Sequence, residues 1–594
     1  MLKPYSKVIW SFLPKLILVM GLGVMTHCQT TGSKLDTAPF YSEAHLDLKK
    51  WKRETTCCSA TGNKIAIASG GTYSSQAGLE IAKAGGNLVD VATATAFALA
   101  VERPHSLGLG GGGFLTLHWQ GKSYFIDFRE TAPQRASQDM YLDKSGNPIA
   151  NSSVAGALAV ATPGFVAGWA QIHHRWGRLP WQKLLAPAIR LAREGFPVYP
   201  SLAETFEQNQ LDFQKDPYLK KLATSPQGKL WKIGDRFTQK DLAKTLELIA
   251  AQGKRPFYET EIAQRIVREV KRRGGILELK DLYDYTVKER TPIVGKFGDF
   301  TYVSAPPPSA GGLILAETFN VLSEFDLAKE AKRPERYAHL LAETFKRGYA
   351  DRAQYVGDPD FVKPDYEFML SNDYAAKLRK EFSWEKTHPS SQISHGSVTK
   401  ESPDTNQLTV MDSEGNAASS TLTINTSFGA ILAVPGTGIY LNNEMDDFSI
   451  KPGIKNAYGL TGSVANAIQP KKRPVSSMMP TILLKDNVAV LALGGKGGSR
   501  IITSVIQVIL NQLFVFPQDL KKSVFAPRIH HQWLPDRLDL EDGFAEQTKE
   551  KLTSLGHSLG KGSWYAEVHA VQRNLDGSLT AVFDPRDEGG ANAQ

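Results

Sequence analysis

A threonine at position 405 stands where the character of the chain changes. The segment 390–404 is rich in Ser, Pro and other polar residues, which is typical of an exposed, mobile loop. From Thr405 onward the pattern becomes that of β-strands, and residues 408–411 and 417–425 are predicted to pair as a hairpin. Local pattern alone favours an ordinary strand residue at this position, because threonine is β-branched.

Cleavage of the peptide bond before Thr405 would change the chemistry of this residue. Its hydroxyl and a free α-amino group would then belong to one residue, and the amine could take the hydroxyl proton as general base. An α-amino group titrates near ~7.7 to 8, so it is a competent base at neutral pH. The chain therefore offers a nucleophile and its base in a single residue, provided that it is cut there.

Thr405 is followed by five motifs, most of which are not generic. They are Asp412-x-x-Gly-Asn416, Thr423-Ile-Asn425-Thr-Ser-Phe-Gly429, Leu441-Asn-Asn-Glu-Met-Asp-Asp-Phe-Ser449, Arg473-Pro-Val-Ser-Ser-Met478 and Gly497-Gly-Ser-Arg500. With the N-terminal part included, the chain closely resembles the γ-glutamyltranspeptidases (glutathione hydrolases) over about residues 60–590. That family belongs to the N-terminal-nucleophile hydrolases, which are made as proenzymes that cut themselves before the nucleophile.

The resemblance implies both the fold and the processing of the chain. The fold would be of the α+β class, a four-layer αββα sandwich with two central sheets between helices. Self-cleavage would separate a large subunit, residues 28–404, from a small subunit, residues 405–594, with Thr405 at the new N-terminus. We expect the two subunits to remain intertwined as one globular heterodimer.

The resemblance also implies how the substrate is held. The donor head of a γ-glutamyl compound carries an α-ammonium beside an α-carboxylate, and both charges need partners when water is removed. The side chains implied for the carboxylate are Arg129, Ser476 and Ser477. Those implied for the ammonium are Asn425, Glu444 and Asp447. From the residues alone, Arg129 could equally be an ordinary ion-pair partner at a strand end, although a planar fork of donors suits a carboxylate.

The implied chemistry is γ-glutamyl transfer without a cofactor or a metal. Thr405 would attack the γ-carbonyl, Thr423 would orient the attacking hydroxyl, and the N–H groups of Gly497 and Gly498 would receive the oxyanion. The γ-glutamyl group, taken from glutathione or a related compound, would pass from Thr405 to water or to an amino acid or peptide. Two alternatives stay open: a related acylase or poly-γ-glutamate hydrolase, and an uncut envelope binding protein that has lost activity.

The sequence departs from the family pattern at two places. Asn406 and Gln407 follow the nucleophile where the family commonly has a second hydroxyl and a histidine, and Lys496 precedes the glycine pair where proline is common. Neither departure removes a residue with an implied chemical role. We expect them to alter the maturation rate, the acceptor site or the pH optimum.

The N-terminal residues have the features of a secretory signal. Three lysines precede an apolar run at 16–25 that contains no acidic residue and is too short to span a bilayer. We therefore expect residues 1–27 to be a signal peptide and the protein to be periplasmic or extracellular. Cys28 stands where a bacterial lipoprotein carries its acylated cysteine, but His27 replaces the usual small residue. Lipid attachment through Cys28 and ordinary signal cleavage both remain open.

Composition excludes several other classes of protein. The 594 residues are 42% hydrophobic and 22% charged, which is typical of a globular protein with a large core. A net charge of +8 is mild for this length and predicts no nucleic-acid partner, and the basic run at 471–473 is interpreted as a solvated loop. Adjacent Cys57 and Cys58 do not suit a disulfide with each other. His530 and His531 lack the spacing of a metal motif and are expected to be structural.

Two glycine-rich runs have different interpretations. Gly108, Gly110 and Gly113 fit a dinucleotide-binding fingerprint, but the run continues into a predicted strand at 114–119 instead of a helix, so nucleotide binding is rejected. The run 494–499 is predicted as a turn between a strand at 488–493 and a helix at 500–513. The amides at that helix start would form an anion site, for which a developing oxyanion is the best guest.

The remaining elements are predicted to form the layers around the site. Helices are expected at 75–84, 89–101, 181–192, 242–250, 261–270, 312–322 and 334–350, and further strands at 65–69, 124–128 and 300–304. The Pro- and Gly-rich segment 451–463 resembles a lid that covers the pocket in some bacterial members, with Tyr458 facing the substrate. An ordinary surface loop is the alternative.

Overall fold

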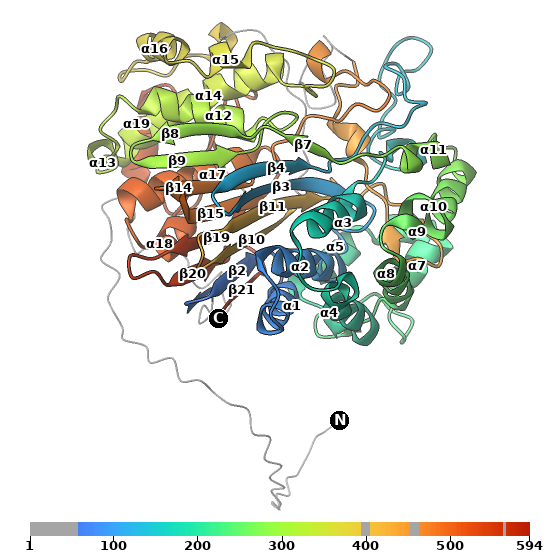
Figure 1. The fold of residues 1–594 in the computed structure, drawn as a ribbon. Coiled ribbons are helices and arrows are strands. Elements are labelled where there is room, and N and C mark those ends of the chain that lie inside the picture. Colours follow the sequence, from blue (N-terminus) through green and yellow to red (C-terminus); the bar gives the residue numbers. More distant parts are fainter. Residues whose placement is uncertain (1–57, 394–403, 452–462, 562–565) are drawn as a thin grey trace, which may run out of the picture. The chain divides into compact units, whose positions relative to one another are not determined.

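Two antiparallel sheets lie face to face between layers of helices (Figure 1). The computed structural model describes residues 58–393, 404–451, 463–561 and 566–594. The expected signal peptide, Cys28, Cys57 and most of the 451–463 segment, including Tyr458, lie outside the described residues. The four-layer αββα arrangement expected from the sequence is confirmed.

Each sheet has seven strands. Sheet I has the order β21 (Gly590–Ala593), β2 (Ile65–Ser69), β10 (Asn406–Asp412), β11 (Ala417–Thr423), β3 (Gly112–Trp119), β4 (Lys122–Asp127) and β7 (Lys288–Arg290). Sheet II has the order β1 (Ser59–Gly62), β20 (Leu579–Val582), β19 (Glu567–Arg573), β15 (Val488–Lys496), β14 (Thr481–Lys485), β9 (Phe300–Ser304) and β8 (Ile293–Phe297). Both sheets thus contain strands from before and after Thr405 paired side by side, so cleavage at this residue would leave the two pieces interlocked.

Helices from different parts of the chain cover the two outer faces (Figure 1). Over sheet I lie α1 (Thr72–Lys83), α2 (Leu88–Glu102), α3 (Phe165–Trp176), α4 (Trp181–Glu194) and α8 (Lys240–Gln252). Over sheet II lie α12 (Gly311–Leu322), α14 (Pro334–Tyr355), α17 (Arg500–Leu510) and α18 (Leu520–Phe525). Among the described residues no helix combines the length and the apolar character needed to cross a membrane.

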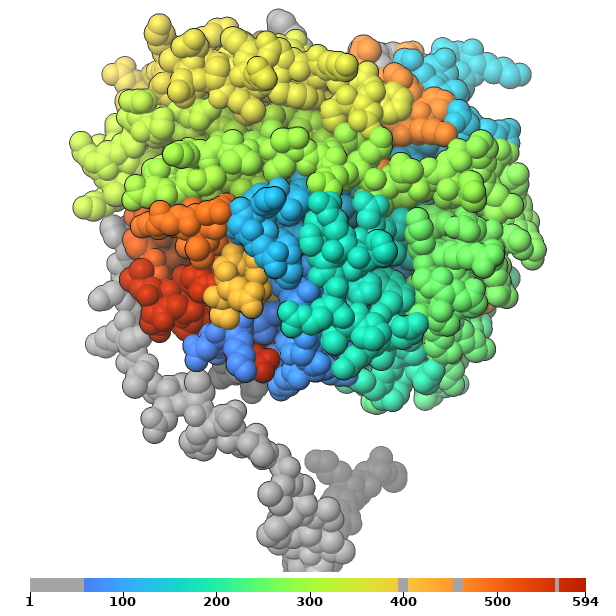
Figure 2. Space-filling model, in the orientation of Figure 1, coloured from blue at the N-terminus to red at the C-terminus, as the bar shows by residue number. Residues whose placement is uncertain are grey.

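Shorter elements complete the described chain. They are α5 (Pro200–Gln208), α6 (Gln210–Gln214), α7 (Pro217–Ala223), α9 (Arg255–Tyr258), α10 (Glu261–Arg272), α11 (Leu279–Tyr283), α13 (Leu327–Glu330), α15 (Tyr366–Met369), α16 (Asn372–Glu381), α19 (Glu546–Ser554), β5 (Phe196–Pro197), β6 (Arg236–Phe237), β12 (Ala433–Val434), β13 (Ile439–Tyr440), β16 (Ile529–His530), β17 (Leu538–Leu540) and β18 (Leu559–Lys561). Figure 2 shows segments from opposite ends of the sequence side by side on one face, as the pairing of β2 with β21 requires.

The space between the sheets changes character along the strands. At one end small and apolar side chains from both sheets, including Ala66, Met411 and Ala492, form a hydrophobic core. Toward the start of β10 this core becomes polar, because the Gln407 side chain donates to Ser419 Oγ at 2.9 Å and accepts from Thr421 Oγ1 at 2.7 Å. Such a bonded network is tolerated in a core because each buried polar group has a partner. It brings β10 into the interior with Thr405 at its edge.

Three expectations about the bounds of local elements need correction. The predicted strand at 417–425 ends at Thr423, because Asn425 has a φ of +74° and turns the chain away. The predicted turn at 494–499 is shorter, because β15 continues through Lys496. The helix predicted at 500–513 ends at Leu510 and a π-helix, Asn511–Val515, follows.

The basic run at 471–473 is only in part the solvated loop that was expected, because Lys471 is exposed but the next two residues are not. Lys472 and Arg473 are buried. Lys472 Nζ donates to the carbonyls of Ala465 and Ala467, at 2.8 and 3.0 Å, and Arg473 Nε lies 3.2 Å from Asp127 Oδ1. The partners that make this burial tolerable come from distant or irregular parts of the chain.

Candidate active site

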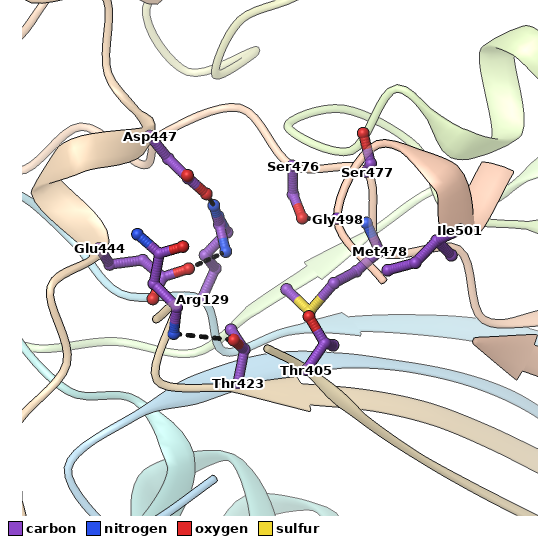
Figure 3. Close-up of a pocket in the computed structure, with 11 residues that line it drawn as sticks. Arg129, Thr405, Thr423, Glu444, Asp447, Ser476, Ser477, Met478, Gly498 and Ile501 are labelled. Carbon is purple, nitrogen blue, oxygen red and sulfur yellow. Dashed lines mark hydrogen bonds and ion pairs between the residues drawn. The ribbon is translucent and has the colours of Figure 1, made fainter. Parts of the chain in front are cut away.

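One small pocket brings together nearly all of the residues implied by the sequence (Figure 3). The predicted residues that line it are Arg129, Thr405, Thr423, Asn425, Glu444, Asp447, Ser476, Ser477 and Gly498. Met478 and Ile501 line it as well, and sequence reasoning missed both. Met478 is the last residue of the Arg473-Pro-Val-Ser-Ser-Met478 motif and Ile501 follows the Gly497-Gly-Ser-Arg500 motif, so their positions in the sequence were the available signal.

Thr405 lies at the base of this pocket, still joined to Asp404 in the uncut chain. It is buried, and its hydroxyl points into the pocket (Figure 3). The carbonyl of Asp404, which belongs to the bond before Thr405, accepts a hydrogen bond from Thr423 Oγ1 at 2.9 Å. The amide of Asn425 donates to that same Thr423 oxygen at 2.8 Å. Thr423 is therefore oriented to polarise the carbonyl that would be attacked in self-cleavage.

Arg129 is a buried cation of the pocket that pairs with two of its carboxylates. It follows β4, and only 1% of it is exposed. Its Nη1 donates to Glu444 Oε1 at 2.7 Å and its Nη2 donates to Asp447 Oδ2. The same guanidinium donates to the main-chain carbonyls of Pro474 and Val475, at 2.9 and 3.0 Å. Burial works against this cation, but the carboxylates of Glu444 and Asp447 outweigh it and raise the pKa of Arg129.

A second layer of ion pairs fixes the strand end that carries Arg129. Asp127 Oδ1 accepts from the amide of Arg129 at 3.0 Å, and Asp127 Oδ2 accepts from Arg290 Nε at 2.7 Å. Arg290 also pairs with Asp358 at 3.1 Å. Buried charges held on both sides in this way resist rotation, so Arg129 is presented to the pocket in one orientation.

The ionic pattern of the pocket suits a zwitterion. The cation implied for the substrate carboxylate and the two carboxylates implied for its ammonium are paired directly with each other. A ligand that carries both charges on one carbon can insert its carboxylate beside Arg129 and its ammonium beside Glu444 and Asp447 without leaving a buried charge unpaired. A ligand with only one of these charges cannot do so.

The two serines of the Arg473-Pro-Val-Ser-Ser-Met478 motif differ in their contacts. Ser476 Oγ accepts from the amide of Met478 at 3.1 Å, and the Ser476 amide donates to the Pro308 carbonyl at 2.9 Å. Ser477 Oγ is buried and has no hydrogen-bond partner among the described residues. An unpartnered hydroxyl is costly in a buried site, and a ligand oxygen would satisfy it.

The glycine pair lies between β15 and α17. Gly498 lines the pocket with a φ of +55°, and Gly497 precedes it with a φ of +143°. Both values fall in the region that a residue with a Cβ rarely adopts. Figure 3 places Gly498 across the pocket from Thr423, close to Ser476 and Ser477. The backbone conformation therefore explains why glycine is needed where the oxyanion donors are implied.

Three histidines away from the pocket, His339, His557 and His530, are hydrogen-bonded to other protein groups. His339, Glu343 and His557 offer ligand atoms within 4.8 Å of one another. However, His339 Nδ1 and His557 Nε2 are hydrogen-bonded at 2.7 Å, and Glu343 Oε1 accepts from the buried Lys346 Nζ at 2.8 Å. We therefore interpret this group as a bonded core and assign no metal to it. His530 is bonded to Thr503 and Gln532, at 2.8 and 2.9 Å, which is the structural role expected for it.

Comparison with known proteins points to one family. The family model described as Gamma-glutamyltranspeptidase matches residues 74–594. The chain is 40% identical over 522 residues to the glutathione hydrolase proenzyme of Escherichia coli, covering 88% of this chain and 90% of that protein. It is also 40% identical over 541 residues to the glutathione hydrolase proenzyme of Pseudomonas aeruginosa, covering 89% and 95% respectively.

Solved structures agree with these sequence relatives. A cephalosporin acylase from Bacillus halodurans has a TM-score of 0.79 at 26% identity, with 91% of this chain and 98% of that chain covered. The γ-glutamyltranspeptidase of Helicobacter pylori has a TM-score of 0.53 at 37% identity, with 54% and 93% covered. The match of the family model over most of the chain, together with relatives of this identity, shows that the protein belongs to the γ-glutamyltranspeptidase family.

Proposed function

We propose that this protein is a self-processing γ-glutamyltransferase that also hydrolyses glutathione and related γ-glutamyl compounds. The observation that carries the proposal is a single pocket in which a buried threonine lies beside one arginine and two carboxylates. This set matches the charges of a γ-glutamyl head group and places a nucleophile within the same cavity.

The reaction begins with self-cleavage. The Thr405 hydroxyl attacks the Asp404 carbonyl, whose oxygen is held by Thr423, and the peptide nitrogen leaves as the new α-amino group. Water then hydrolyses the resulting ester. The mature Thr405 carries both the attacking hydroxyl and the amine that accepts its proton.

Turnover repeats the same chemistry on the substrate. With its α-carboxylate beside Arg129 and its α-ammonium beside Glu444 and Asp447, the substrate presents its γ-carbonyl to Thr405. The Gly497 and Gly498 amides receive the oxyanion, and such a donor is typically worth ~3 to 4 kcal/mol. The leaving amine departs with a proton from the Thr405 amine. Water or an acceptor amine then releases the γ-glutamyl group, so hydrolysis and transfer compete for one intermediate.

The alternative with a structural basis is a β-lactam acylase, given the likeness to the cephalosporin acylase fold. Glu444 and Asp447 are both buried, and both line the pocket. A glutaryl side chain has no ammonium to place beside them, so this pair favours an unsubstituted glutamyl head. We expect turnover of a γ-glutamyl anilide and of glutathione, and little or none of a glutaryl anilide. The reverse preference would contradict the proposal.

Two subunits and an extracytoplasmic location complete the proposal. The precursor is cut between Asp404 and Thr405 into a heterodimer, and residues 1–27 direct it to the periplasm or the cell exterior, with Cys28 as the residue that would carry a lipid anchor. Sequencing the N-terminus of the small fragment tests the cut, because it should read Thr-Asn-Gln-Leu. Metabolic labelling with a fatty acid, with and without Cys28→Ser, tests the anchor.

Removing the Thr423 hydroxyl should slow self-cleavage. Thr423→Val keeps the shape of the side chain but deprives the Asp404 carbonyl of its donor. Loss of one oxyanion donor costs roughly a hundredfold to a thousandfold in rate. The measurement is the time course of fragment appearance on a denaturing gel. Ser427→Ala is the control, because Ser427 donates to the Asp404 side chain at 2.6 Å and not to the carbonyl, so it should have the smaller effect.

Removing the Ser477 hydroxyl should weaken substrate binding without destabilising the protein. Because Ser477 Oγ has no hydrogen-bond partner among the described residues, Ser477→Ala should leave the melting temperature unchanged or slightly higher. Loss of a hydrogen bond to the substrate carboxylate should lower kcat/KM by roughly tenfold or more. If kcat/KM were unchanged, Ser477 would have no contact with the substrate.

A further inference from the structure

A cluster of charged side chains that includes Asp404, the residue before Thr405, has no role in the proposed reaction. Its members are Arg103, Asp404, Lys496, Glu567, Asp587 and Glu588, and we call them the rear charge cluster. Lys496 is at its centre, with Nζ 2.9 Å from Asp587 Oδ2 and 3.3 Å from Glu567 Oε1. Arg103 Nη1 shares the same Asp587 oxygen at 3.1 Å. Only 7% of Lys496 is exposed.

The packing of the two sheets places the end of β15 that carries Lys496 toward Thr405. Met411 of β10 packs with Ala492 and Val571. Two residues earlier on the same face, Thr409 Oγ1 donates to the His569 carbonyl at 3.1 Å. Beyond Met411, the Ala489 amide donates to the Gly415 carbonyl at 3.2 Å, so the later residues of β10 lie near the start of β15 and its earlier residues lie near the end of β15.

A further contact between the two sheets lies closer to Thr405. The Gln407 side chain lies against Gly494, where an added Cβ would be 2.4 Å from its Oε1. Gly494 pairs with His569, and the next residues on this face, Lys496 and Glu567, pair with each other. Thr405 is two residues before Gln407, so it lies toward the ends of β15 and β19 that carry Lys496 and Glu567.

The charge of Lys496 also reaches the bond that must be cut. Asp404 contributes the carbonyl half of that bond. Burial raises the pKa of the Asp404 carboxyl, while the Lys496 ammonium acts in the opposite direction. A cation that acts on Asp404 is close enough to act on the amine that cleavage gives to the adjoining Thr405.

The carboxyl groups of the rear charge cluster differ in the direction of their pKa shifts. Although burial opposes it, Lys496 and Arg103 keep the pKa of Asp587 well below its usual range. Burial raises the pKa of Glu567 to about 8, so this group is largely uncharged at pH 7. Burial and the neighbouring Asp587 also raise the pKa of Glu588. Asp587 is thus the carboxyl group whose pKa the two cations lower, whereas the pKa values of Glu567 and Glu588 are raised.

Two histidines complete the surroundings of Lys496. Burial lowers the pKa of His105 well below its usual range, and it lowers that of His569 to about 4. Both rings are therefore neutral at pH 7. They neither add to nor offset the positive charge that Lys496 brings toward Thr405.

We propose that Lys496 is a positioning residue that fixes a positive charge beside the new α-amino group of Thr405, so that this amine is uncharged near neutral pH and accepts the hydroxyl proton. The inference rests on the proposed function. An ordinary α-amino group is only roughly a tenth to a sixth unprotonated at pH 7. A nearby cation disfavours the protonated form and enlarges the fraction that can act as a base.

The test is the pH dependence of kcat/KM for a γ-glutamyl anilide, measured on cut enzyme and corrected for the fraction cut. Lys496→Met removes the charge and keeps the length, so the acid limb of the profile should move to higher pH by about half a unit or more. Lys496→Arg should restore the limb. Asp587→Asn removes the anion that offsets Lys496, so the limb should move to lower pH.

Opposite shifts in the two variants separate this role from a structural one. A purely structural disturbance lowers kcat/KM at every pH but gives no reason for shifts of opposite sign. An unmoved limb in Lys496→Met, or shifts of the same sign in both variants, would overturn the inference. If Lys496→Met does not fold or cut, Asp587→Asn decides alone, and an unmoved limb there overturns it. Absence of turnover in the unaltered enzyme would instead refute the proposed function.

Discussion

Thr405→Ala is expected to give one uncut chain with no measurable γ-glutamyl turnover. The substitution removes the hydroxyl that makes the first attack on the Asp404 carbonyl in maturation and on the substrate in turnover. Because the same atom serves both steps, maturation and catalysis should fail together, with turnover lower by about a thousandfold or more. A denaturing gel shows the first effect and a γ-glutamyl anilide assay shows the second.

Strand β10, which begins at the residue after Thr405, offers a matched control for this substitution. Thr409 is also buried on the same face of β10, and its hydroxyl donates to the His569 carbonyl at 3.1 Å. Thr409→Ala therefore removes an equivalent hydroxyl from the same strand, and we expect the protein to be cut at the normal position. Two normal fragments from Thr405→Ala would show that another group cuts the chain, and the assignment of Thr405 would be wrong.

Much of the fold could be predicted because local pattern and packing agree. The strand predicted at 65–69 has the observed bounds of β2, an apolar run buried between β10 and β21. The hairpin of β10 and β11 was predicted from its polar turn and its strand residues. In these segments the local preference and the tertiary environment favour the same structure, so the sequence was sufficient.

The errors fall where distant parts of the chain decide the outcome. Glycines at 494 and 495 were predicted to turn the chain, but they continue β15 because they pair with His569 and Val568 of β19. The Gln407 side chain occupies the space that a Cβ would fill at Gly494, so glycine is needed there. The basic run at 471–473 was predicted to be solvated, but Lys472 and Arg473 find carbonyl and carboxylate partners inside the protein. Neither set of partners is visible from local sequence.

The site itself was predicted from motifs, but its internal pairing was not. Arg129 and Glu444 are 315 positions apart, and nothing in the sequence around either residue indicates that the two side chains bond directly to each other. Motifs supply residue types and their order. Only the folded structure shows that a substrate has to insert between charged side chains that are already paired with each other.

Arg129→Lys is expected to lower kcat/KM by roughly a hundredfold to a thousandfold while leaving the chain cut. Arginine spans Glu444, Asp447 and two carbonyls with a planar fork, whereas lysine has a single ammonium that cannot reach all of them. Truncating one partner of a buried, bonded charge pair at a binding site costs about 2 to 5 kcal/mol. Lysine keeps the positive charge but loses part of the hydrogen bonding, so we expect a loss of binding energy inside this range. The measurement is kcat/KM for a γ-glutamyl anilide, with the two fragments confirmed on a gel.

Arg129→Met goes further, because it removes the charge as well. Glu444 and Asp447 would then lose their cation, and breaking a buried pair in this way costs about 3 to 5 kcal/mol of folding stability. A buried carboxylate without a cation is costly only while it is ionised, so the melting temperature should fall more at pH 8 than at pH 5. An equal loss at both values would mean that the two carboxylates gain other partners in the variant.

Arg528→Lys is the matched control for both substitutions. Arg528 is fully buried, pairs with Asp584 at 2.8 Å and donates to the carbonyls of Ala566 and Val524, so it has the same kinds of bonds as Arg129. It does not line the pocket. We expect this variant to lose stability but to keep its kcat/KM. If both lysine variants instead lost stability and kcat/KM in parallel, the effect at Arg129 would reflect a damaged fold, and its role in holding the substrate carboxylate would have no support.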